Sequence, residues 1–124
     1  MSVPGRISPT ILEERLVQFG VSVIRIVESF SKNPGAKNIA NQISRSCMSP
    51  ALNYAEAQVA ESRRDFIHKM KIALKELKET NVSLRFVNEL GYCSDQYALQ
   101  KCIREGNELI AIFIASIKTA KGIR

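Results

Sequence analysis

The hydrophobic residues of this chain recur at steps of three and four, the spacing of an α-helix that buries one face. Four such stretches, separated by turn or capping residues, predict helices over about 9–32, 36–60, 63–90 and 95–120. The alternation typical of strands is hard to find. We therefore expect an all-α, four-helix domain over residues 9–124, preceded by a flexible N-terminal arm over residues 1–8.

Short sequence signals mark the ends of these helices. Ser8-Pro9 combines an N-cap residue with a proline at the first helical position, where a missing N–H costs nothing. Ser62, followed by Asp65, is a capping box that begins the third helix, and Gly91 is placed for a left-handed C-cap. Ser94-Asp95 is expected to cap the fourth helix.

The second predicted helix has polar residues where a bundle helix is normally apolar. Pro50 should kink this helix and leave the carbonyl of Ser46 without its donor. Two interpretations of Ser46, Ser49 and Asn53 stay open. They satisfy the loose backbone groups and one another, or they line a polar pocket that binds a ligand.

The fourth predicted helix is apolar over more than one face. Its seam is the bundle pattern of Leu99, Ile103, Gly106, Ile110, Phe113 and Ile117. Leu109, Ile112 and Ile114 widen this stripe beyond what a small four-helix domain is expected to bury by itself. Exposed patches of this kind usually mark an interface, so these three residues predict a homo-oligomer.

The chain has 124 residues and a net charge of +6, which raises the odds of a polyanionic partner. The candidate phosphate-binding residues are Arg45, Arg63, Arg64, Lys69, Lys71, Lys75 and Lys78. Most of them lie on the third predicted helix, where spacings of three and four place Lys71, Lys75 and Lys78 on one face. The alternative is an ordinary solvated helix face.

The sequence contains no recognisable catalytic or metal-binding motif. The three cysteines form no Cys-x-x-Cys pair. The single histidine, His68, follows Asp65 by three residues on the same helical face, an arrangement more typical of a surface pair than of a catalytic one. We therefore expect no catalytic residues, no metal, no cofactor and no enzyme activity. The N-terminus lacks the apolar core of a signal peptide, and the longest apolar run, Leu109 to Ala115, is too short for a bilayer. A cytoplasmic protein without membrane contact is expected.

A longer motif covers the second and third predicted helices. It comprises Gln42-Ile43, Arg45-Ser46, Ser49, Asn53 to Ala57, Glu61-Ser62, Asp65 to Lys69, Ala73 to Glu76, Glu79-Thr80 and Leu90 to Tyr92. In these residues the chain closely resembles the small bacterial four-helix-bundle proteins encoded by intervening sequences in 23S rRNA genes. The family-motif polar core is Ser46, Ser49, Asn53 and Glu56.

The resemblance implies an up-down-up-down antiparallel bundle that assembles as a homopentameric ring without enzymatic activity. A related branch, the accessory proteins of diversity-generating retroelements, forms a basic pentamer that binds nucleic acid and a reverse transcriptase. We therefore expect a homo-oligomer that binds RNA or DNA through its basic surface. The alternative is a scaffold for protein–protein interaction, for example with a reverse transcriptase, that makes no nucleic-acid contact.

Overall fold

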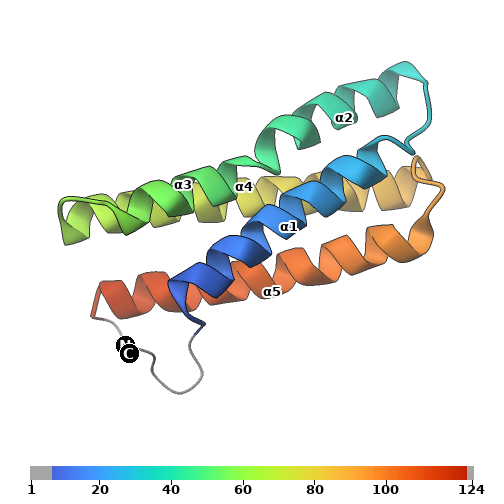
Figure 1. Ribbon diagram of the computed structural model, residues 1–124. Helices are drawn as coiled ribbons and strands as arrows, with labels where there is room; N and C mark the ends of the chain where they lie inside the picture. Colours follow the sequence, from blue (N-terminus) through green and yellow to red (C-terminus); the bar gives the residue numbers. More distant parts are fainter. Residues whose placement is uncertain (1–6, 123–124) are drawn as a thin grey trace.

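The computed structural model describes residues 7–122, which form helices packed side by side (Figure 1). The helices are α1 (Pro9–Val27), α2 (Pro34–Ser46), α3 (Ser49–Gln58), α4 (Arg63–Leu90) and α5 (Gln96–Ala120). Because α2 and α3 follow each other as two segments of one broken rod, the arrangement is a bundle of four rods. The all-α prediction is confirmed, while residues 1–6 of the expected arm lie outside the described range.

The first helix ends at Val27, so the predicted end near residue 32 is wrong. The Ser29 hydroxyl donates to the carbonyl of Ile26 at 2.7 Å, and the chain then turns. Phe30, which is buried, forms an isolated backbone bridge with Cys93. The hydrophobic pattern continued to Phe30 because this ring does enter the core, although it enters from a loop.

The helix predicted over 36–60 is divided into two helices that meet at Cys47-Met48, so the irregularity predicted at Pro50 is confirmed but is a complete break and not a kink. Pro50 is the second residue of α3 and has no N–H to donate to the carbonyl of Ser46, so the helical ladder is interrupted there. The break lies directly against α1. A Cβ atom at Gly20 would be 3.1 Å from the Cys47 carbonyl oxygen, so the glycine permits this close approach.

The capping predictions for α4 and α5 are confirmed. The Ser62 hydroxyl accepts a hydrogen bond from the Asp65 N–H at 3.0 Å, and an Asp95 carboxylate oxygen accepts from the Ala98 N–H at the same distance. Gly91 ends α4 with φ of 68°, a left-handed conformation that favours glycine. These local signals place both ends of α4 at the predicted residues.

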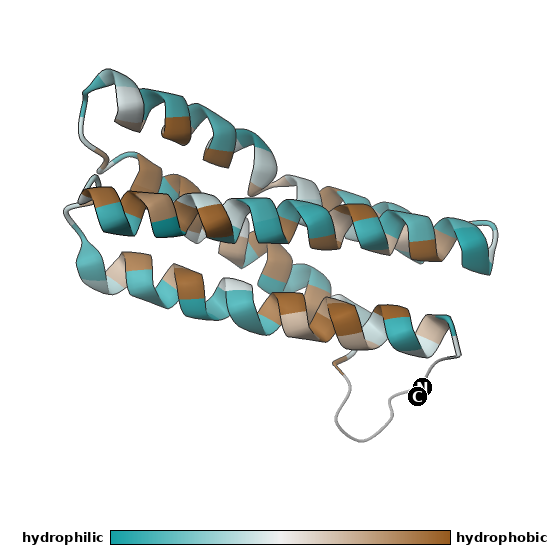
Figure 2. Cartoon of the chain, turned by 180° about the vertical axis from the view of Figure 1, so that it is seen from behind, coloured by the Kyte–Doolittle hydropathy of each residue, from teal (hydrophilic) through white to brown (hydrophobic). Residues whose placement is uncertain are grey.

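Each rod contacts two neighbours. The backbone of α1 lies beside α2, α3 and α5, and that of α4 also lies beside α2, α3 and α5, but α1 and α4 make no backbone contact and stand at diagonal positions. Hydrophobic residues recur along each helix between hydrophilic ones (Figure 2). The largest fully buried side chains include Leu16, Ile43, Met70, Leu77, Leu84, Leu99, Leu109 and Phe113.

No helix within residues 7–122 combines the length and apolarity needed to span a membrane.

Two polar side chains, Thr80 and Asn81, are buried in α4. The Asn81 amide donates to the carbonyl of Ile103 at 3.1 Å and to the side-chain oxygen of Asn107 at 3.0 Å, so it ties α4 to α5. A Cβ atom at Gly106 would clash with the Asn81 side chain. Glycine in the α5 seam therefore makes room for a buried amide, a role that the seam pattern alone did not predict.

Candidate functional site

The predicted basic residues do not form one uniform surface. Lys69 pairs with Glu56 at 2.6 Å, and this hydrogen bond raises the pKa of Lys69. Lys75 lies 3.9 Å from Glu79, and Arg45 lines a groove between α2 and α4 together with Lys78 and Glu79. The other five members of the predicted set form no ion pair within residues 7–122, and they are Arg45, Arg63, Arg64, Lys71 and Lys78.

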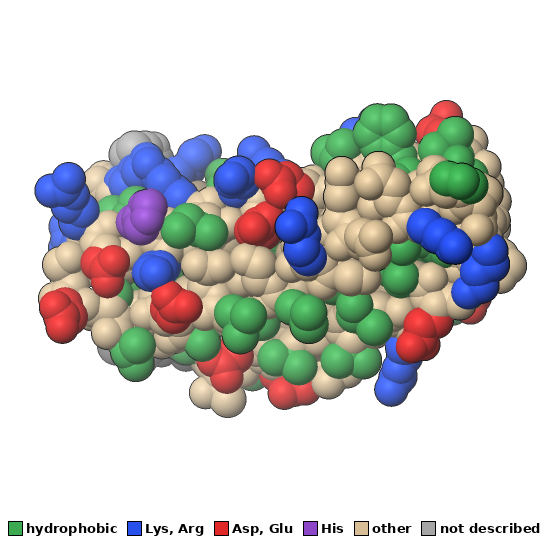
Figure 3. All heavy atoms as spheres, turned by 90° about the horizontal axis from the view of Figure 1, so that it is seen from above, with side chains coloured by type: hydrophobic (Ala, Val, Ile, Leu, Met, Phe, Trp, Pro, Cys, Tyr) green, Lys and Arg blue, Asp and Glu red, His purple; other side chains and the backbone are tan. Residues whose placement is uncertain are grey.

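A second helix contributes to the basic surface. Lys71 of α4 lies beside Lys121, which directly follows α5, within hydrogen-bonding reach. The close approach of the Lys71 side chain, together with the charge repulsion between the two groups, lowers the pKa of Lys121. Lys118 lies three residues earlier on α5 and is exposed as well. We call Arg63, Arg64, Lys71, Lys118 and Lys121 the basic end, and Figure 3 shows Lys and Arg side chains gathered at one end of the visible face.

The sequence-based interpretation included only the α4 part of this basic end. Lys71 and Lys121 are fifty positions apart in the chain, so no local spacing relates them. The signal that was available is the predicted pairing of helices. If the third and fourth helices run in opposite directions, the start of one lies beside the end of the other.

The predicted polar core is not in the core. Ser46, Ser49 and Asn53 are half-buried, and Glu56 is exposed. Asn53 donates to the hydroxyl of Ser49 at 2.9 Å and to its carbonyl at 3.0 Å, so its bonds are local to α3. Ser46 shares a 2.7 Å hydrogen bond with buried Thr80. These contacts fit the interpretation in which the polar groups near the break satisfy one another.

A groove of about 890 Å³ lies between α2 and α4. It is lined by Ile39, Gln42, Arg45, Ser46, Glu76, Lys78, Glu79, Val82, Ser83 and Phe86. Burial and a hydrogen bond with Glu79 raise the pKa of Glu76. The groove therefore has a charged part near the α2–α3 break and an apolar part around Ile39, Val82 and Phe86, which we call the α2–α4 groove.

A second exposed apolar surface lies on α1 and the start of α3. Its members are Val17, Val21, Met48 and Leu52, and we call it the α1–α3 ridge. Leu52 is 64% exposed, and Phe86 in the α2–α4 groove is 58% exposed. Isolated exposed hydrophobic residues are common, but grouped ones usually mark an interface. The grouped exposed apolar residues therefore lie on α1, α3 and α4, while exposed Tyr97 belongs to α5 and exposed Val59 follows α3.

Of the three residues predicted to form an interface on the fourth helix, Leu109 is corrected by the structure. Leu109 is 0% exposed and belongs to the protomer core, because α5 packs between α1 and α4 and buries two of its sides within one chain. Ile112 and Ile114 are half-buried. Neighbours within the protomer thus account for Leu109, and an interface role for Ile112 and Ile114 stays a prediction.

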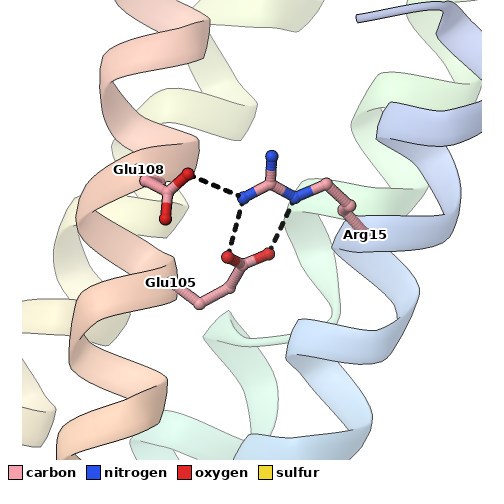
Figure 4. A network of polar contacts seen from close by, with 3 residues as sticks. All are labelled: Arg15, Glu105 and Glu108. Atoms are coloured by element: carbon pink, nitrogen blue, oxygen red, sulfur yellow. Dashed lines mark hydrogen bonds and ion pairs between the residues drawn. The ribbon is translucent and has the colours of Figure 1, made fainter.

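One ion-pair network fastens α1 to α5 (Figure 4). Arg15 donates from Nε and from one terminal nitrogen to the two carboxylate oxygens of Glu105, at 2.9 and 2.7 Å, and also to Glu108 at 3.4 Å. These bonds, led by the one with Glu105, raise the pKa of Arg15. The network contains charges of both signs in fixed geometry, which is typical of a structural contact.

Titratable groups that could act in catalysis are sparse in residues 7–122. His68 is exposed on α4, and no group of three or more His, Cys, Asp or Glu side chains there is arranged to hold a metal ion. Burial raises the pKa of the Cys47 and Cys102 thiols to about 11, which keeps them protonated at neutral pH. Free buried thiols of this kind behave as small hydrophobic side chains.

Fold and surface together define a small helical-bundle protein with a basic end and two exposed apolar surfaces. The model of the 23S rRNA-intervening sequence protein family matches residues 12–115, and the chain belongs to this family. It is similar to a protein of unknown function from the S23 ribosomal protein family of Bacteroides thetaiotaomicron, known from a crystal structure. The two share 27% identity with a TM-score of 0.80, over 90% of this chain and 99% of the other. A search among curated proteins found no match.

Proposed function

We propose that this protein is a non-enzymatic homo-oligomer that binds nucleic acid, RNA or DNA, through the phosphate backbone at its basic end. The observation that supports this most is the position of Lys71 beside Lys121, two exposed ammonium groups from different helices. A phosphate between them would replace their mutual repulsion with two attractive contacts. Binding would release counterions and would depend little on base sequence.

The proposed protomer is an up-down-up-down antiparallel bundle. Short connections support this arrangement, because α3 leads to α4 through residues 59–62 and α4 leads to α5 through residues 91–95. Helices joined by so few residues are normally antiparallel neighbours. This direction also accounts for the proximity of the start of α4 and the end of α5, where the basic end lies.

The proposed assembly is the homopentameric ring that the family resemblance implies. Exposed apolar residues on α1, α3 and α4 support self-association. Five copies would present five basic ends, and several weak phosphate contacts on one polymer bind much more tightly than a single contact. A protein with modest net charge can then hold a nucleic acid at moderate salt.

The test is binding of a fluorescein-labelled, mixed-sequence RNA by fluorescence anisotropy at 50 and 200 mM NaCl. The wild type should bind at low salt and lose at least about tenfold in affinity at the higher salt. Lys71→Glu/Lys121→Glu should weaken binding by at least about tenfold at 50 mM NaCl. Lys32→Glu/Lys37→Glu, the same charge change at exposed sites on the connection from α1 to α2 and on α2, is the matched control.

Equal binding by the two double variants would show that net charge alone attracts the RNA and that the basic end is not its site. No binding by the wild type at 50 mM NaCl would overturn the proposed function.

The second candidate function is a scaffold for another protein, such as a reverse transcriptase. The exposed apolar residues around Phe86 favour it, since they provide a surface for a protein without requiring the lysines. An oligomer that ignores RNA and DNA at every salt concentration would favour this candidate over the first.

A further inference from the structure

A pocket of about 630 Å³ lies at the same end of the bundle as the basic end. Residues at the start of α1, the end of α3, the start of α4 and the end of α5 line it, and Figure 1 shows these stretches toward one end of the bundle. We call it the end pocket, and its walls include Leu12, Tyr54, Phe66, Met70 and Ala115. None of the described residues that line it is charged, whereas charges of both signs line the α2–α4 groove. Its volume is within the range of about 300–1,000 Å³ that is usual for ligand-binding pockets.

Tyr54 places a hydroxyl group without a partner in this pocket. The residue is 4% exposed, and its ring packs edge-on against Phe113 with a centroid distance of 5.7 Å. The hydroxyl forms no hydrogen bond within residues 7–122. It is not fully enclosed, because the one fully enclosed side-chain atom without a partner in that range is an oxygen of Asn81. Burial is the main cause that raises the pKa of Tyr54, so the hydroxyl is protonated and can donate to a ligand in the pocket.

Two cations border the end pocket. On α4, Arg63 lies three residues before Phe66, and on α5, Lys118 lies three residues after Ala115, so each cation shares a helix face with a residue that lines the pocket. Arg63 and Lys118 are exposed, and neither forms an ion pair with a described residue. An anionic group attached to a ligand in the pocket would therefore meet two unpaired positive charges.

Carboxylates also lie near this end of the bundle. Glu56 is paired with Lys69. Glu61 precedes α4, Asp65 lies in its first turn, and Glu13 is close enough to the buried hydroxyl to affect its ionisation. The five cations of the basic end outnumber these three carboxylates, so the surroundings of the end pocket are positive and favour an anionic ligand.

The neutral polar groups of the end pocket indicate the class of ligand. The side chains of Gln58, Ser116 and Thr119 line it and form no hydrogen bond within residues 7–122. With the Tyr54 hydroxyl, they surround an apolar wall with uncharged donors and acceptors. A nucleobase matches this combination, since it has apolar faces, uncharged donors and acceptors along its edge, and phosphates beside it in the strand. An acyl chain or a hydrophobic side chain would contact the wall but leave the polar groups and the bordering cations unused.

We propose that an unpaired nucleobase of the bound nucleic acid enters the end pocket, with its edge at Tyr54 and its flanking phosphates at Arg63 and Lys118. The inference rests on the proposed nucleic-acid binding and adds the kind of strand, which is a single-stranded segment, loop or bulge. Charge alone would favour a duplex, which carries one negative charge per about 1.7 Å against about 3.4 Å for one of its strands. A preference for the unpaired strand therefore reports contact with its bases.

The test compares three fluorescein-labelled RNA probes of equal length by fluorescence anisotropy at 50 mM NaCl. They are an unstructured single strand, the same sequence as a duplex, and the same single strand with abasic central positions. The wild type should bind the intact single strand at least about tenfold more tightly than either of the others. The abasic strand has the same number of phosphates, so its weaker binding measures the contribution of the bases.

Substitutions in the end pocket should remove this preference. Ala115→Phe fills the pocket from an exposed position and should lower the affinity for the single strand to that for the duplex. Tyr54→Phe removes only the hydroxyl and should weaken single-strand binding by about three- to tenfold, with duplex binding unchanged. Ala55→Phe and Tyr97→Phe make the same changes at exposed positions outside the pocket and should bind as the wild type does. Circular dichroism should show the same helix content for every variant.

A second measurement locates the base in the wild-type protein and needs no substitution. Single-stranded RNA that contains 4-thiouridine is cross-linked by near-ultraviolet light, and the attached peptides are identified by mass spectrometry. The cross-links should fall on residues that line the end pocket, such as Tyr54, Phe66 and Met70. Cross-links confined to the α2–α4 groove would overturn the assignment.

The outcomes separate this inference from the proposed function. Equal binding of the intact and abasic strands by the wild type would overturn base insertion and leave phosphate binding at the basic end standing. A single-strand preference that survives Ala115→Phe would place the bases elsewhere and would also overturn it. A wild type that binds none of the probes would overturn the proposed function and this inference together, and would favour a segment of a protein as the occupant.

Discussion

The contact between Gly106 and Asn81 makes Gly106→Ala the most informative single substitution in the protomer. On an ordinary helix this change stabilises, since alanine has the higher helix propensity by about 1 kcal/mol. Here the new methyl group would occupy the space of the Asn81 side chain, which is 4% exposed. The amide would have to move, and its hydrogen bonds to Ile103 and Asn107 would be lost or distorted.

The expected size follows from three contributions. Overpacking a close contact costs about 1–3 kcal/mol, and leaving a buried amide unpaired costs about 1–3 kcal/mol. The side-chain oxygen of Asn81 already lacks a hydrogen-bond partner among the described groups, so it cannot make up for hydrogen bonds that the displaced amide nitrogen loses. After the propensity gain of about 1 kcal/mol, the net loss of unfolding free energy should be about 3 kcal/mol, or roughly 10 °C in melting temperature.

Urea and thermal unfolding, followed by circular dichroism at 222 nm, measure this loss. The decisive comparison is a double-mutant cycle with Asn81→Ala, because residues in contact give non-additive effects. Once Asn81 is alanine, Gly106→Ala should cost nothing or should stabilise by up to about 1 kcal/mol. Additive effects of the two substitutions would refute the proposed contact between Gly106 and Asn81.

Three further predictions concern ionisation, the helix break and the surface. The Cys47 and Cys102 thiols ionise near pH 11 when folded and near pH 9 in the unfolded chain, so their contribution to unfolding free energy is complete below pH 9. That contribution should disappear between pH 9 and 11, and Cys47→Ala/Cys102→Ala should fall less steeply over this interval in urea titrations. Asn53→Ala should lower the unfolding free energy by less than about 1 kcal/mol, because its bonds are local and half-buried; a loss of about 3 kcal/mol would place it in a buried network. Glu105→Gln should cost about 0.5–1 kcal/mol through its partly exposed pair with Arg15, and an undiminished difference in 1 M NaCl would contradict an electrostatic origin.

Local signals in the sequence were sufficient where a helix end depends on its own residues. Ser62 and Gly91 mark the ends of α4, and Asp95 caps α5, because a side-chain cap and a left-handed glycine act within one turn. The end of α1 could not be found in this way. Its position depends on Phe30 meeting Cys93, a contact between residues 63 positions apart.

The functional surfaces were less predictable, because they depend on which helix faces remain uncovered. The apolar stripe of α5 looked wide enough for an interface, but Leu109 is covered by neighbours within the chain. Val82 and Phe86 lie beside a lysine stripe and show no clear apolar periodicity with it, so their exposure becomes visible only in three dimensions. The same holds for Lys71 and Lys121, which the packing of α4 against α5 brings together.

The most direct test of the proposed function is the light-scattering mass of the wild-type protein on a sizing column, alone and with a mixed-sequence RNA at 50 and 200 mM NaCl. The proposal predicts a mass near five times 13.9 kDa without RNA, and a larger complex with RNA that dissociates at the higher salt. A mass of one chain that RNA leaves unchanged at both salt concentrations would contradict it.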